Sequence, residues 1–285
     1  MGGLETDGMS CIGDGTLDAR LLLEAVCGTD RNDLLVHGEQ PVAPEAEEKY
    51  LNWIRQRAEH IPLQQLTGEQ GFMGLTFSVN EHVLIPRQDT EILVEEVLKE
   101  LHDGMRVLDM CTGSGCILLS LLHYSNDCEG LGVDLSAEAL EVAGRNVLKV
   151  LTPEKAEHAH FLQSDLFEKV EGKFEIIVSN PPYIASAEVE KLMPEVRDHE
   201  PRMALDGTED GLYFYRRIIE EAGKHLVSSG MLFFEIGYDQ GQAVSELMRT
   251  EGYCDVQVVQ DYAGLDRVVF GTYVTVQPAP FAKSR

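Results

Sequence analysis

The stretch VLDMCTGSGCI, at residues 107–117, decides the fold of this chain. Its apolar start is typical of a buried strand, and it continues through a turn containing Gly113 and Gly115 into an apolar run that predicts a helix. Glycines in such a turn let a ligand approach the backbone at the N-terminus of the helix. Leu118 stands where the dinucleotide fingerprint G-x-G-x-x-G/A requires a small residue, and the turn lacks the lysine of a P-loop. The turn therefore argues against NAD and FAD.

Segments of strand and helix character alternate from residue 106 onward. Repeated β-α units form mostly parallel sheets covered by helices, so an α/β fold is predicted. The predicted strands cover 106–110, 130–134, 160–164, 174–179 and 230–236, with 256–260 and 267–273 as a closing antiparallel pair. The predicted helices cover 117–124, 136–151, 210–226 and 240–251, and Ser136 and Asp210 are candidate N-caps.

A region of helices is predicted before this alternation. Apolar residues recur at helical spacing between residues 17 and 60. We divide the chain into a helical domain at 1–64, a β-hairpin connector at 65–90 and a larger catalytic domain at 91–285, whose first helix has Thr90 as its candidate N-cap. The glycine-rich start (1–15) and the tail from residue 277 are expected to be disordered. The helical domain has two interpretations, a structural cap and a domain that recognises the substrate.

Composition limits the classes of function. The formal net charge is −26, from 49 acidic and 23 basic residues, and such a field repels a phosphate backbone, which disfavours a nucleic-acid partner. The six cysteines form no C-x-x-C motif, which indicates reduced thiols in a cytoplasmic protein. No apolar run in the sequence approaches the roughly 18 residues of a membrane span. We therefore expect a cytoplasmic monomer without a membrane partner.

Polar residues follow two further strands of the predicted sheet. Asp134 ends the second strand, where an acid can accept hydrogen bonds from both hydroxyls of a ribose. Asp165 and Leu166 follow the third strand, where a polar and an apolar residue could bracket an adenine. In open sheets, ligands bind outside the carboxyl ends of the strands. The glycine turn, the ribose acid and the adenine bracket therefore fall at successive strand ends along one edge.

The fourth strand ends in Asn180-Pro181-Pro182-Tyr183. Two prolines fix two φ angles and remove two backbone donors, and a residue before proline is biased toward extended geometry. The resulting stiff turn offers two acceptors, the side-chain oxygen of Asn180 and the carbonyl of Pro181. This pair suits a planar NH2 group, which adenine and a carboxamide both provide. An ordinary strand-ending turn is the alternative interpretation.

The ordered set of these features resembles the class I S-adenosylmethionine-dependent methyltransferases, and Asn-Pro-Pro-Tyr resembles the signature of those that modify an exocyclic or amide nitrogen. Four further segments are similar to the HemK/PrmC family, the glutamine N5-methyltransferases of peptide chain release factors: PLQQLTGEQGFMGLTF (62–77), LIPRQDTE (84–91), EPRMALDGTEDGL (200–212) and GLDRVV (264–269). The similarity covers Leu17 to Thr272. It implies a Rossmann-like, mostly parallel seven-stranded sheet with an antiparallel last strand, plus a small N-terminal helical domain.

The resemblance also implies roles for individual residues. S-adenosylmethionine would be held by Asp109, Cys111, Thr112, Gly113, Ser114, Gly115, Asp134, Leu135, Asp165, Leu166 and Asn180. The glutamine of a Gly-Gly-Gln (GGQ) loop in the release factor would enter at Asn180, Pro181, Pro182 and Tyr183, of which Asn180, Pro181 and Tyr183 would be catalytic. Arg87 and Glu91 would contact the substrate loop or form structural ion pairs. Direct displacement by the amide nitrogen would need neither a metal nor a catalytic histidine.

Three positions depart from the family's pattern. Cys111 stands where the family usually has the first glycine of the turn, Gln88 replaces a proline, and Leu166 stands where an aromatic residue is sometimes found. Three other functions stay open: a glutamine methyltransferase of a ribosomal protein, an adenine-N6 methyltransferase of DNA or RNA, and a non-catalytic S-adenosylmethionine-binding protein. The acidic charge disfavours the second, and the intact Asn180 and Asp134 disfavour the third.

Overall fold

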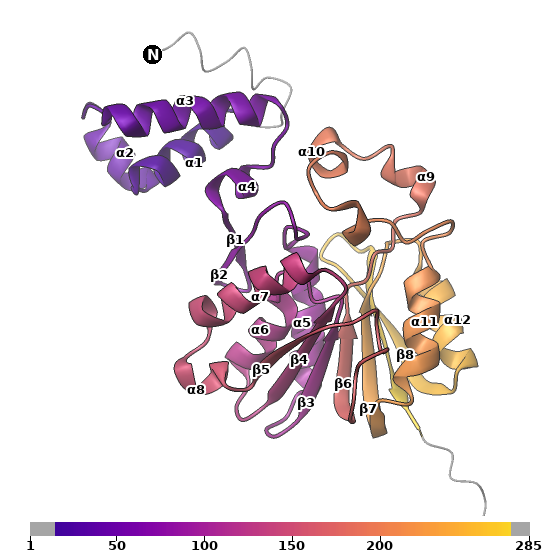
Figure 1. Cartoon of the computed structure of the whole chain (residues 1–285). Coiled ribbons are helices and arrows are strands. Elements are labelled where there is room, and N and C mark those ends of the chain that lie inside the picture. Colours follow the sequence, from indigo (N-terminus) through magenta and orange to yellow (C-terminus); the bar gives the residue numbers. More distant parts are fainter. Residues whose placement is uncertain (1–14, 275–285) are drawn as a thin grey trace, which may run out of the picture.

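A seven-stranded sheet forms the centre of the computed structural model, which describes residues 15–274 (Figure 1). Its strands are β3 (Arg106–Met110), β4 (Glu129–Asp134), β5 (Ala159–Gln163), β6 (Phe174–Ser179), β7 (Leu226–Glu235), β8 (Tyr253–Gln260) and β9 (Asp266–Tyr273). The strand order is β5-β4-β3-β6-β7-β9-β8. Pairing is parallel from β5 to β7, whereas β9 runs antiparallel to both of its neighbours. The predicted sheet with an antiparallel last strand is thus confirmed.

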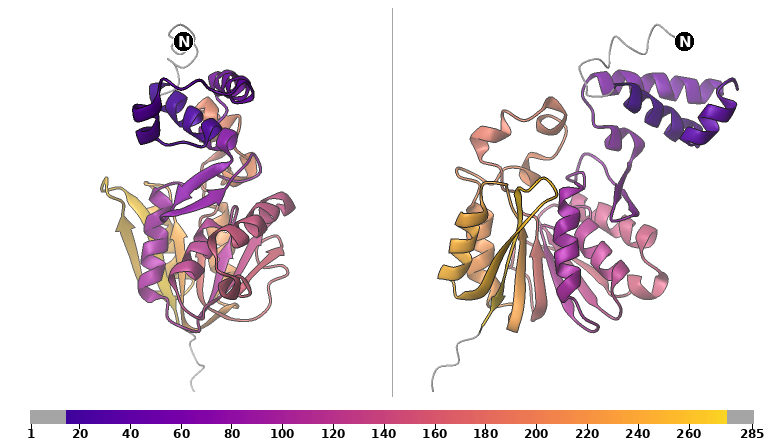
Figure 2. Two further views of the ribbon diagram at one scale, coloured as in Figure 1. Left: turned by 90° about the vertical axis from the view of Figure 1, so that its left-hand side faces the viewer. Right: turned by 180° about the vertical axis from the view of Figure 1, so that it is seen from behind.

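Two hydrophobic cores cover the two faces of the sheet. Successive strand residues point to opposite faces, so Val107 belongs to one core and Leu108 to the other. The first core is covered by α5 (Asp89–Glu100), α6 (Cys116–Tyr124) and α7 (Ala137–Val150), and the second by α11 (Tyr213–Ala222) and α12 (Gly241–Thr250). Figure 2 shows these two groups of helices on opposite sides of the sheet. Because both faces are covered, the central strands are nearly continuous apolar runs.

Most of the predicted elements are present, and three predicted details are wrong. Ser136 caps α7 as expected, since its hydroxyl accepts a hydrogen bond from the Ala139 N–H at 3.0 Å. Thr90 is not an N-cap, because α5 already begins at Asp89 and Thr90 is buried inside its first turn. The helix predicted to run from an Asp210 cap to Leu226 covers only Tyr213–Ala222. Its N-cap position is Leu212 and not Asp210, and Leu226 is the first residue of β7.

The N-terminal region consists of α1 (Gly15–Cys27), α2 (Arg31–His37), α3 (Pro44–Ala58) and the short α4 (Leu63–Thr67). The predicted hairpin follows as β1 (Glu69–Phe72) and β2 (Leu75–Ser78). The rings of Phe72 and Phe77 meet edge to face in the first core, which anchors the hairpin to the larger domain. The predicted disorder lies outside the described residues, except that Gly15 begins α1. The exact domain boundaries at 64 and 90 remain predictions.

A second group of short helices interrupts the chain between β6 and α11. They are α9 (Ser186–Val189), α10 (Pro194–Arg197) and the 3-10 helix η1 (Arg202–Ala204); a further short helix, α8 (Pro153–Ala156), precedes β5. The segment with α9 and α10 faces the N-terminal helices across the carboxyl edge of the sheet (Figures 1 and 2). Arg57 of α3 joins the two, because it is paired with Asp18 at 2.7 Å and with Glu195 of α10 at 2.9 Å.

Two general features of the described residues bear on the earlier expectations. Five cysteines, Cys27, Cys111, Cys116, Cys128 and Cys254, are free thiols, as the sequence predicted. Within residues 15–274, the helices are all too short or too polar to cross a membrane.

The ion pairs of Arg57 lead to a stability prediction. The Arg57 side chain is 6% exposed, so its replacement by methionine leaves two largely buried carboxylates without their cation. We expect R57M to lower the free energy of unfolding by about 3 kcal/mol, measured by urea denaturation. The matched control is R216M, which removes an exposed pair with Asp210 and should cost less than about 1 kcal/mol. Equal losses in the two variants would contradict a structural role for Arg57.

Candidate active site

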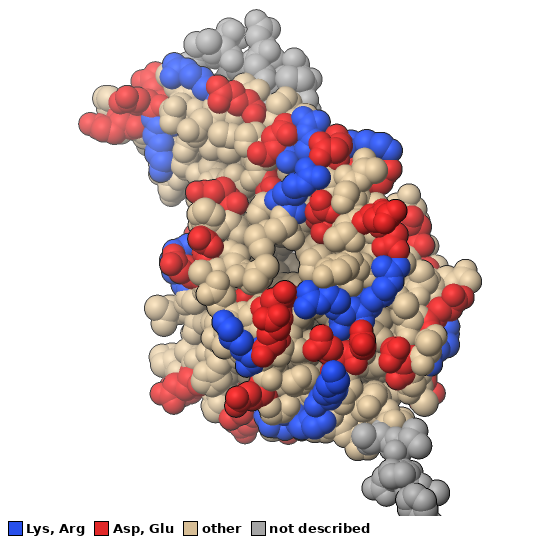
Figure 3. All heavy atoms as spheres, turned by 45° about the vertical axis from the view of Figure 1, so that its right-hand side comes forward, with Lys and Arg blue, Asp and Glu red and all other residues tan. Residues whose placement is uncertain are grey.

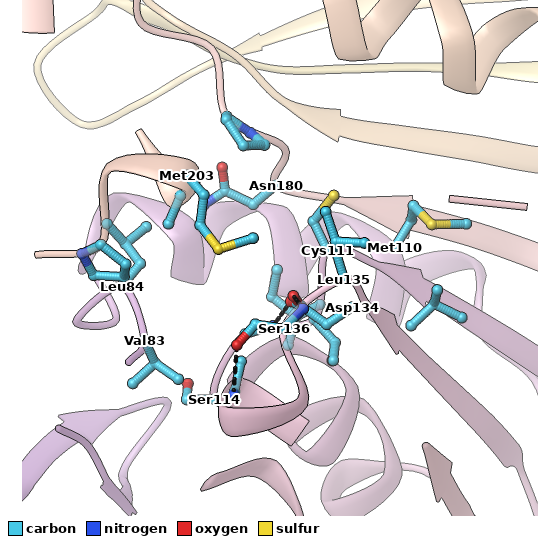
Figure 4. Close-up of a pocket in the computed structure, with 18 of the residues that line it drawn as sticks. Val83, Leu84, Met110, Cys111, Ser114, Asp134, Leu135, Ser136, Asn180 and Met203 are labelled. Carbon is cyan, nitrogen blue, oxygen red and sulfur yellow. Dashed lines mark hydrogen bonds between the residues drawn. The ribbon is translucent and has the colours of Figure 1, made fainter. Parts of the chain in front are cut away.

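A cavity of about 220 Å³ opens at the carboxyl edge of the sheet, beside the ends of β3, β4 and β6 (Figure 4). Most of the predicted site residues line it: Arg87, Cys111, Thr112, Gly113, Ser114, Asp134, Leu135, Asp165, Leu166, Asn180 and Pro182. Asp109, Gly115, Pro181 and Tyr183 do not line this cavity. Most of the predicted site residues therefore face one cavity, and the structure separates them from the predicted residues that lie behind it.

The turn after β3 has the backbone geometry that its glycines suggested. Gly113 has φ +55° and Gly115 has φ +77°, values in the left-handed region that favours glycine. A side chain at Gly115 would also lie within 3.2 Å of Ala143 and Leu119, so this glycine permits close packing of α6 on α7. Cys111 has φ +63°, which explains why glycine is usual at its position. Burial raises the pKa of the Cys111 thiol, which is therefore neutral.

Asp134 holds the glycine turn in place. One carboxylate oxygen accepts a hydrogen bond from the Gly113 N–H at 2.9 Å, and the other accepts one from the Ser136 N–H at 2.9 Å. Figure 4 shows Asp134 and Ser136 next to each other at the cavity. Burial raises the pKa of Asp134, and the hydrogen bonds from these backbone groups lower it in part. Each carboxylate oxygen can accept a second hydrogen bond, so Asp134 can also bind a ligand in the cavity.

Asp109 lies behind the turn and was predicted to contact the ligand. Its side chain is fully buried, accepts a hydrogen bond from the Thr112 hydroxyl at 2.6 Å and accepts a longer one from the Leu118 N–H at 3.3 Å. Burial raises its pKa from 3.8 to about 7, and the hydrogen bond from Thr112 opposes this shift. Asp109 thus supports the turn and the first turn of α6, which the sequence pattern could not distinguish from a ligand contact.

The end of β5 supplies one polar and one apolar group to the rim of the cavity. Asp165 is paired with Arg217 of α11 at 2.9 Å, which leaves one carboxylate oxygen outside this pair. Leu166, with φ +46°, is buried in the second core and faces the cavity with one side. Leu135, more than half exposed, provides apolar surface after β4.

The Asn-Pro-Pro-Tyr turn divides this cavity from a second one of about 200 Å³. Asn180 and Arg87 line both cavities, whereas Tyr183 lines only the second. The hydroxyl of Tyr183 donates a hydrogen bond to Glu235 at 3.2 Å, and Pro181 is buried beside it. Glu235 also lines the second cavity, and the remaining walls of this cavity are apolar: Leu84, Ile184, Val196, Ala204 and Leu205.

The two charged residues before α5 differ in their surroundings. Arg87 forms an ion pair with the buried Glu200, and its own side chain is 41% exposed at the cavities. Glu91 accepts a hydrogen bond from the Met73 N–H at 2.7 Å, so it fastens the hairpin to α5. The predicted contact with a substrate loop is therefore retained for Arg87 alone.

Three buried polar residues at the site were missed by the sequence analysis. Asn146 of α7 bonds both the Ser78 backbone and the Ser114 carbonyl, so it ties the hairpin to the glycine turn. Thr90 and Glu235 lie next to Asn180 and Tyr183. Glu235 carried a signal, because a carboxylate ending the apolar strand β7 reaches the same edge as Asp134. Asn146 and Thr90 carried none, since each lies inside an amphipathic helix.

Charges of both signs are mixed on the surface. On the face shown in Figure 3, the visible Lys and Arg side chains stand next to Asp and Glu side chains. Arg202 and Arg216 are examples, since they pair with Glu190 and Asp210 respectively. Paired cations of this kind are poorly suited to bind a phosphate backbone.

The chain is similar to known proteins over most of its length. Residues 8–68 match the PrmC N-terminal domain, and residues 87–196 match the methyltransferase small domain. A release factor glutamine methyltransferase from Agrobacterium fabrum is 40% identical over 264 residues, which cover 90% of each chain. One from Clostridium acetobutylicum is 42% identical over 88% of this chain and 89% of the relative. A solved methyltransferase from Pyrococcus furiosus, 18% identical, has a TM-score of 0.51 over 72% of this chain and 91% of its own, which shows the fold alone.

The buried Asp109 makes stability depend on pH. The pKa of Asp109 is about 7 in the folded protein but near 3.8 when the carboxyl is free. As pH rises from about 4 to about 7, the unfolded chain has therefore already lost this proton while the folded protein still holds it. The free energy of unfolding of the wild type decreases over this range. An asparagine at position 109 does not titrate, so the D109N variant does not lose this contribution to stability as pH rises. The difference between the free energy of unfolding of D109N and that of the wild type should therefore increase by about 4 kcal/mol over this range.

Urea unfolding at pH 4 and pH 8 measures this difference. D103N, at an exposed position between α5 and β3, is the matched control and should show a much smaller change with pH. A D109N difference that is the same at both pH values would contradict the raised pKa of Asp109.

Proposed function

The chain belongs to the family of release factor glutamine methyltransferases, and we propose that it transfers the methyl group of S-adenosylmethionine to the side-chain amide nitrogen, N5, of the glutamine in the GGQ motif of peptide chain release factors. The observation that carries the proposal is the position of Asn180 in the wall shared by two cavities. A methyl donor in the first cavity and an amide in the second can meet at this residue.

The chemistry of the first cavity suits S-adenosylmethionine. Asp134 has lone pairs for the ribose hydroxyls, and the oxygen of Asp165 that Arg217 leaves free can accept from the amino group of adenine. Leu135 and Leu166 offer apolar surface to the adenine ring. When bound, S-adenosylmethionine supplies a methyl group on a positively charged sulfur, which a nitrogen lone pair can attack.

The second cavity suits the side chain of a glutamine. Its apolar walls can cover methylene groups, and Arg87 at its rim can contact the backbone of the substrate loop. Asn180 and the Pro181 carbonyl are the two acceptors that we assign to the amide NH2 group. Tyr183, hydrogen-bonded to Glu235, closes one side of this cavity.

The acceptors act by position. The nitrogen of an amide is a poor nucleophile because its lone pair is delocalised into the carbonyl. When Asn180 and the Pro181 carbonyl accept hydrogen bonds from both N–H groups of the amide, the lone pair of its nitrogen is directed toward the first cavity. The free energy of substrate binding offsets the entropy lost in fixing this orientation. The nitrogen becomes acidic as it gains the methyl group, so no strong base is required. Most of the rate then comes from positioning and preorganised dipoles.

Features outside the two cavities distinguish a release factor from the alternative substrates, a ribosomal protein and a nucleic acid. A glutamine of a ribosomal protein presents the same amide. Three relatives with 40–42% identity are named release factor glutamine methyltransferases, and their names support the release factor. Adenine also presents a planar NH2 group, but the net charge of −26 and the paired surface cations oppose a nucleic acid. A cytoplasmic location follows from a substrate that acts in translation. It remains a prediction, as does a monomeric state.

The function is tested by offering the chain three substrates with radiolabelled S-adenosylmethionine. We expect label in a peptide chain release factor and none in a release factor whose GGQ glutamine is replaced by alanine. A ribosomal protein and DNA serve as competitors in parallel reactions. Label in DNA alone would reject a protein amide as the substrate, and label in the ribosomal protein alone would reject the release factor.

The assigned role of Asn180 predicts a selective loss of turnover. N180A removes a preorganised acceptor from the reacting nitrogen, so turnover should fall by roughly 10²–10³-fold. Affinity for S-adenosylmethionine, measured by calorimetry, should stay within about threefold, because the ribose and adenine contacts remain. The matched control is N126A, at an exposed position after α6, which should retain full turnover. Near-normal turnover of N180A would remove Asn180 from the mechanism.

A further inference from the structure

A buried carboxylate, that of Glu200, holds the arginine that lines both cavities. The side chain of Glu200 is 1% exposed, whereas that of its partner Arg87 is 41% exposed. Oε1 of Glu200 accepts a hydrogen bond from Nη2 of Arg87, and Oε2 accepts one from the backbone N–H of Ile85 at 3.2 Å. The proposed function uses Arg87 but assigns nothing to the carboxylate that binds it.

The chain around Arg87 is held both at its backbone and at the tip of its side chain. Pro86 stands between Ile85 and Arg87, so the φ angle at this position is fixed. The carbonyl of Pro86 also accepts a hydrogen bond from the side chain of Gln70 at 3.2 Å. A long arginine side chain loses rotamer freedom when it is ordered, and Glu200 orders this one before a ligand binds.

This arrangement leaves donors of Arg87 for a ligand. An arginine side chain has five N–H donors. Of the described residues, Glu200 is the one that accepts a hydrogen bond from the side chain of Arg87, through Nη2. The remaining donors can therefore bind the backbone carbonyl groups of a substrate loop at the rim of the second cavity, which Arg87 lines.

The segment that carries Glu200 is fastened to the N-terminal helical region. Gln65 of α4 donates a hydrogen bond to the carbonyl of His199 at 2.7 Å. The Nε2 atom of His199 lies 3.1 Å from the carbonyl oxygen of Glu59, which follows α3. Both contacts are made by the residue next to Glu200 in the chain. The position of the N-terminal helices is thus linked to the position of Arg87.

We propose that Glu200 is a positioning residue that holds Arg87 toward the substrate loop, and that the contacts of the N-terminal helices with His199 set the place of Glu200. The inference rests on the proposed function, because the contact of Arg87 with a release factor is part of that function. Arg87 would bind the loop equally before and during methyl transfer. Loss of its positioning should therefore raise KM for the release factor and leave kcat unchanged.

The first test is E200Q. Glutamine removes the charge that binds Arg87, but its oxygen can still accept from the Ile85 N–H. We expect KM for the release factor to rise about 10-fold, since a hydrogen bond between charged groups is lost. The kcat and the calorimetric affinity for S-adenosylmethionine should stay at wild-type values. E188Q, which removes an exposed pair with Lys191 in the same segment, is the matched control and should keep the wild-type KM.

Two results with E200Q would overturn the proposal. One is a wild-type KM for the release factor. The other is a loss of affinity for S-adenosylmethionine with an unchanged KM, which would place Arg87 on the methyl donor. E200D decides the question if E200Q does not fold. It keeps the negative charge but is one methylene shorter, so it reaches Arg87 less well and KM should rise here too. A wild-type KM in a folded E200D would likewise overturn the proposal.

A double variant tests whether Glu200 acts through Arg87. R87M alone should raise KM, and R87M/E200Q should have the same KM as R87M, because residues that act through one another are not additive. The double variant also removes the unpaired buried carboxylate that R87M leaves behind. A further rise of KM in the double variant, as large as that of E200Q alone, would show that Glu200 acts elsewhere.

The link to the N-terminal helices is tested with Q65M, which removes the donor to the His199 carbonyl. We expect KM to rise about threefold in the wild-type background, since one hydrogen bond is lost, and to stay constant in the R87M background. Q40M, at an exposed position between α2 and α3, is the matched control. An equal rise of KM in both backgrounds, or none in either, would overturn this link.

These outcomes differ from a failure of the proposed function. If the wild-type chain transfers no methyl group to a release factor, the proposed function is wrong and the positioning role falls with it. If the wild type methylates a release factor and E200Q does so with the same KM, the positioning role alone is wrong.

Discussion

The parallel register of β3 with β4 and β6 fixes where the chemistry of this protein occurs. In this register Met110 lies opposite both Val133 and Ser179, and Ser179 lies opposite Phe234 of β7. The residues that come next leave the sheet at one level: Cys111, Asp134, Asn180 and Glu235. A slip of one residue in any of these pairings would turn its strand's side chains to the other face. The apolar residues of the two cores therefore hold the register, and the register assembles the site.

The buried polar residues around the glycine turn show how a rigid ligand site is built on this frame. Asp134 accepts hydrogen bonds from two backbone N–H groups, one of them that of Gly113, and the side chain of Asn146 donates a hydrogen bond to the carbonyl of Ser114. Asp109 fixes Thr112 from beneath. A buried carboxyl group costs free energy, as its raised pKa shows, but it prevents the turn from relaxing when a ligand is absent. The turn is thus preorganised for binding, which reduces the ordering entropy that a ligand must overcome.

The sequence was sufficient for the elements that depend on local pattern. Apolar runs, glycines and caps placed the sheet, and Asp134 and Asn180 at strand ends were assigned to the site before their neighbours were known. The sequence could not predict which of these residues face the cavity and which lie behind it, because that depends on the side of a turn to which each side chain points. Asp109 and Gly115 therefore appeared as ligand contacts although they lie behind the cavity. Thr90 looked like a helix cap because only the fold brings it to Asn180.

The choice of substrate depends on parts of the chain that surround the second cavity. Val196 and Leu205 in its wall belong to the segment between β6 and α11, which begins directly after the Asn-Pro-Pro-Tyr turn. This segment is fastened to the N-terminal helices by the pair of Arg57 with Glu195 and by the hydrogen bond from Gln65 to the His199 carbonyl at 2.7 Å. The helices thus do more than cover the sheet. By fixing the wall of the cavity that would receive the glutamine, they tie recognition of a protein loop to the residues that orient its amide.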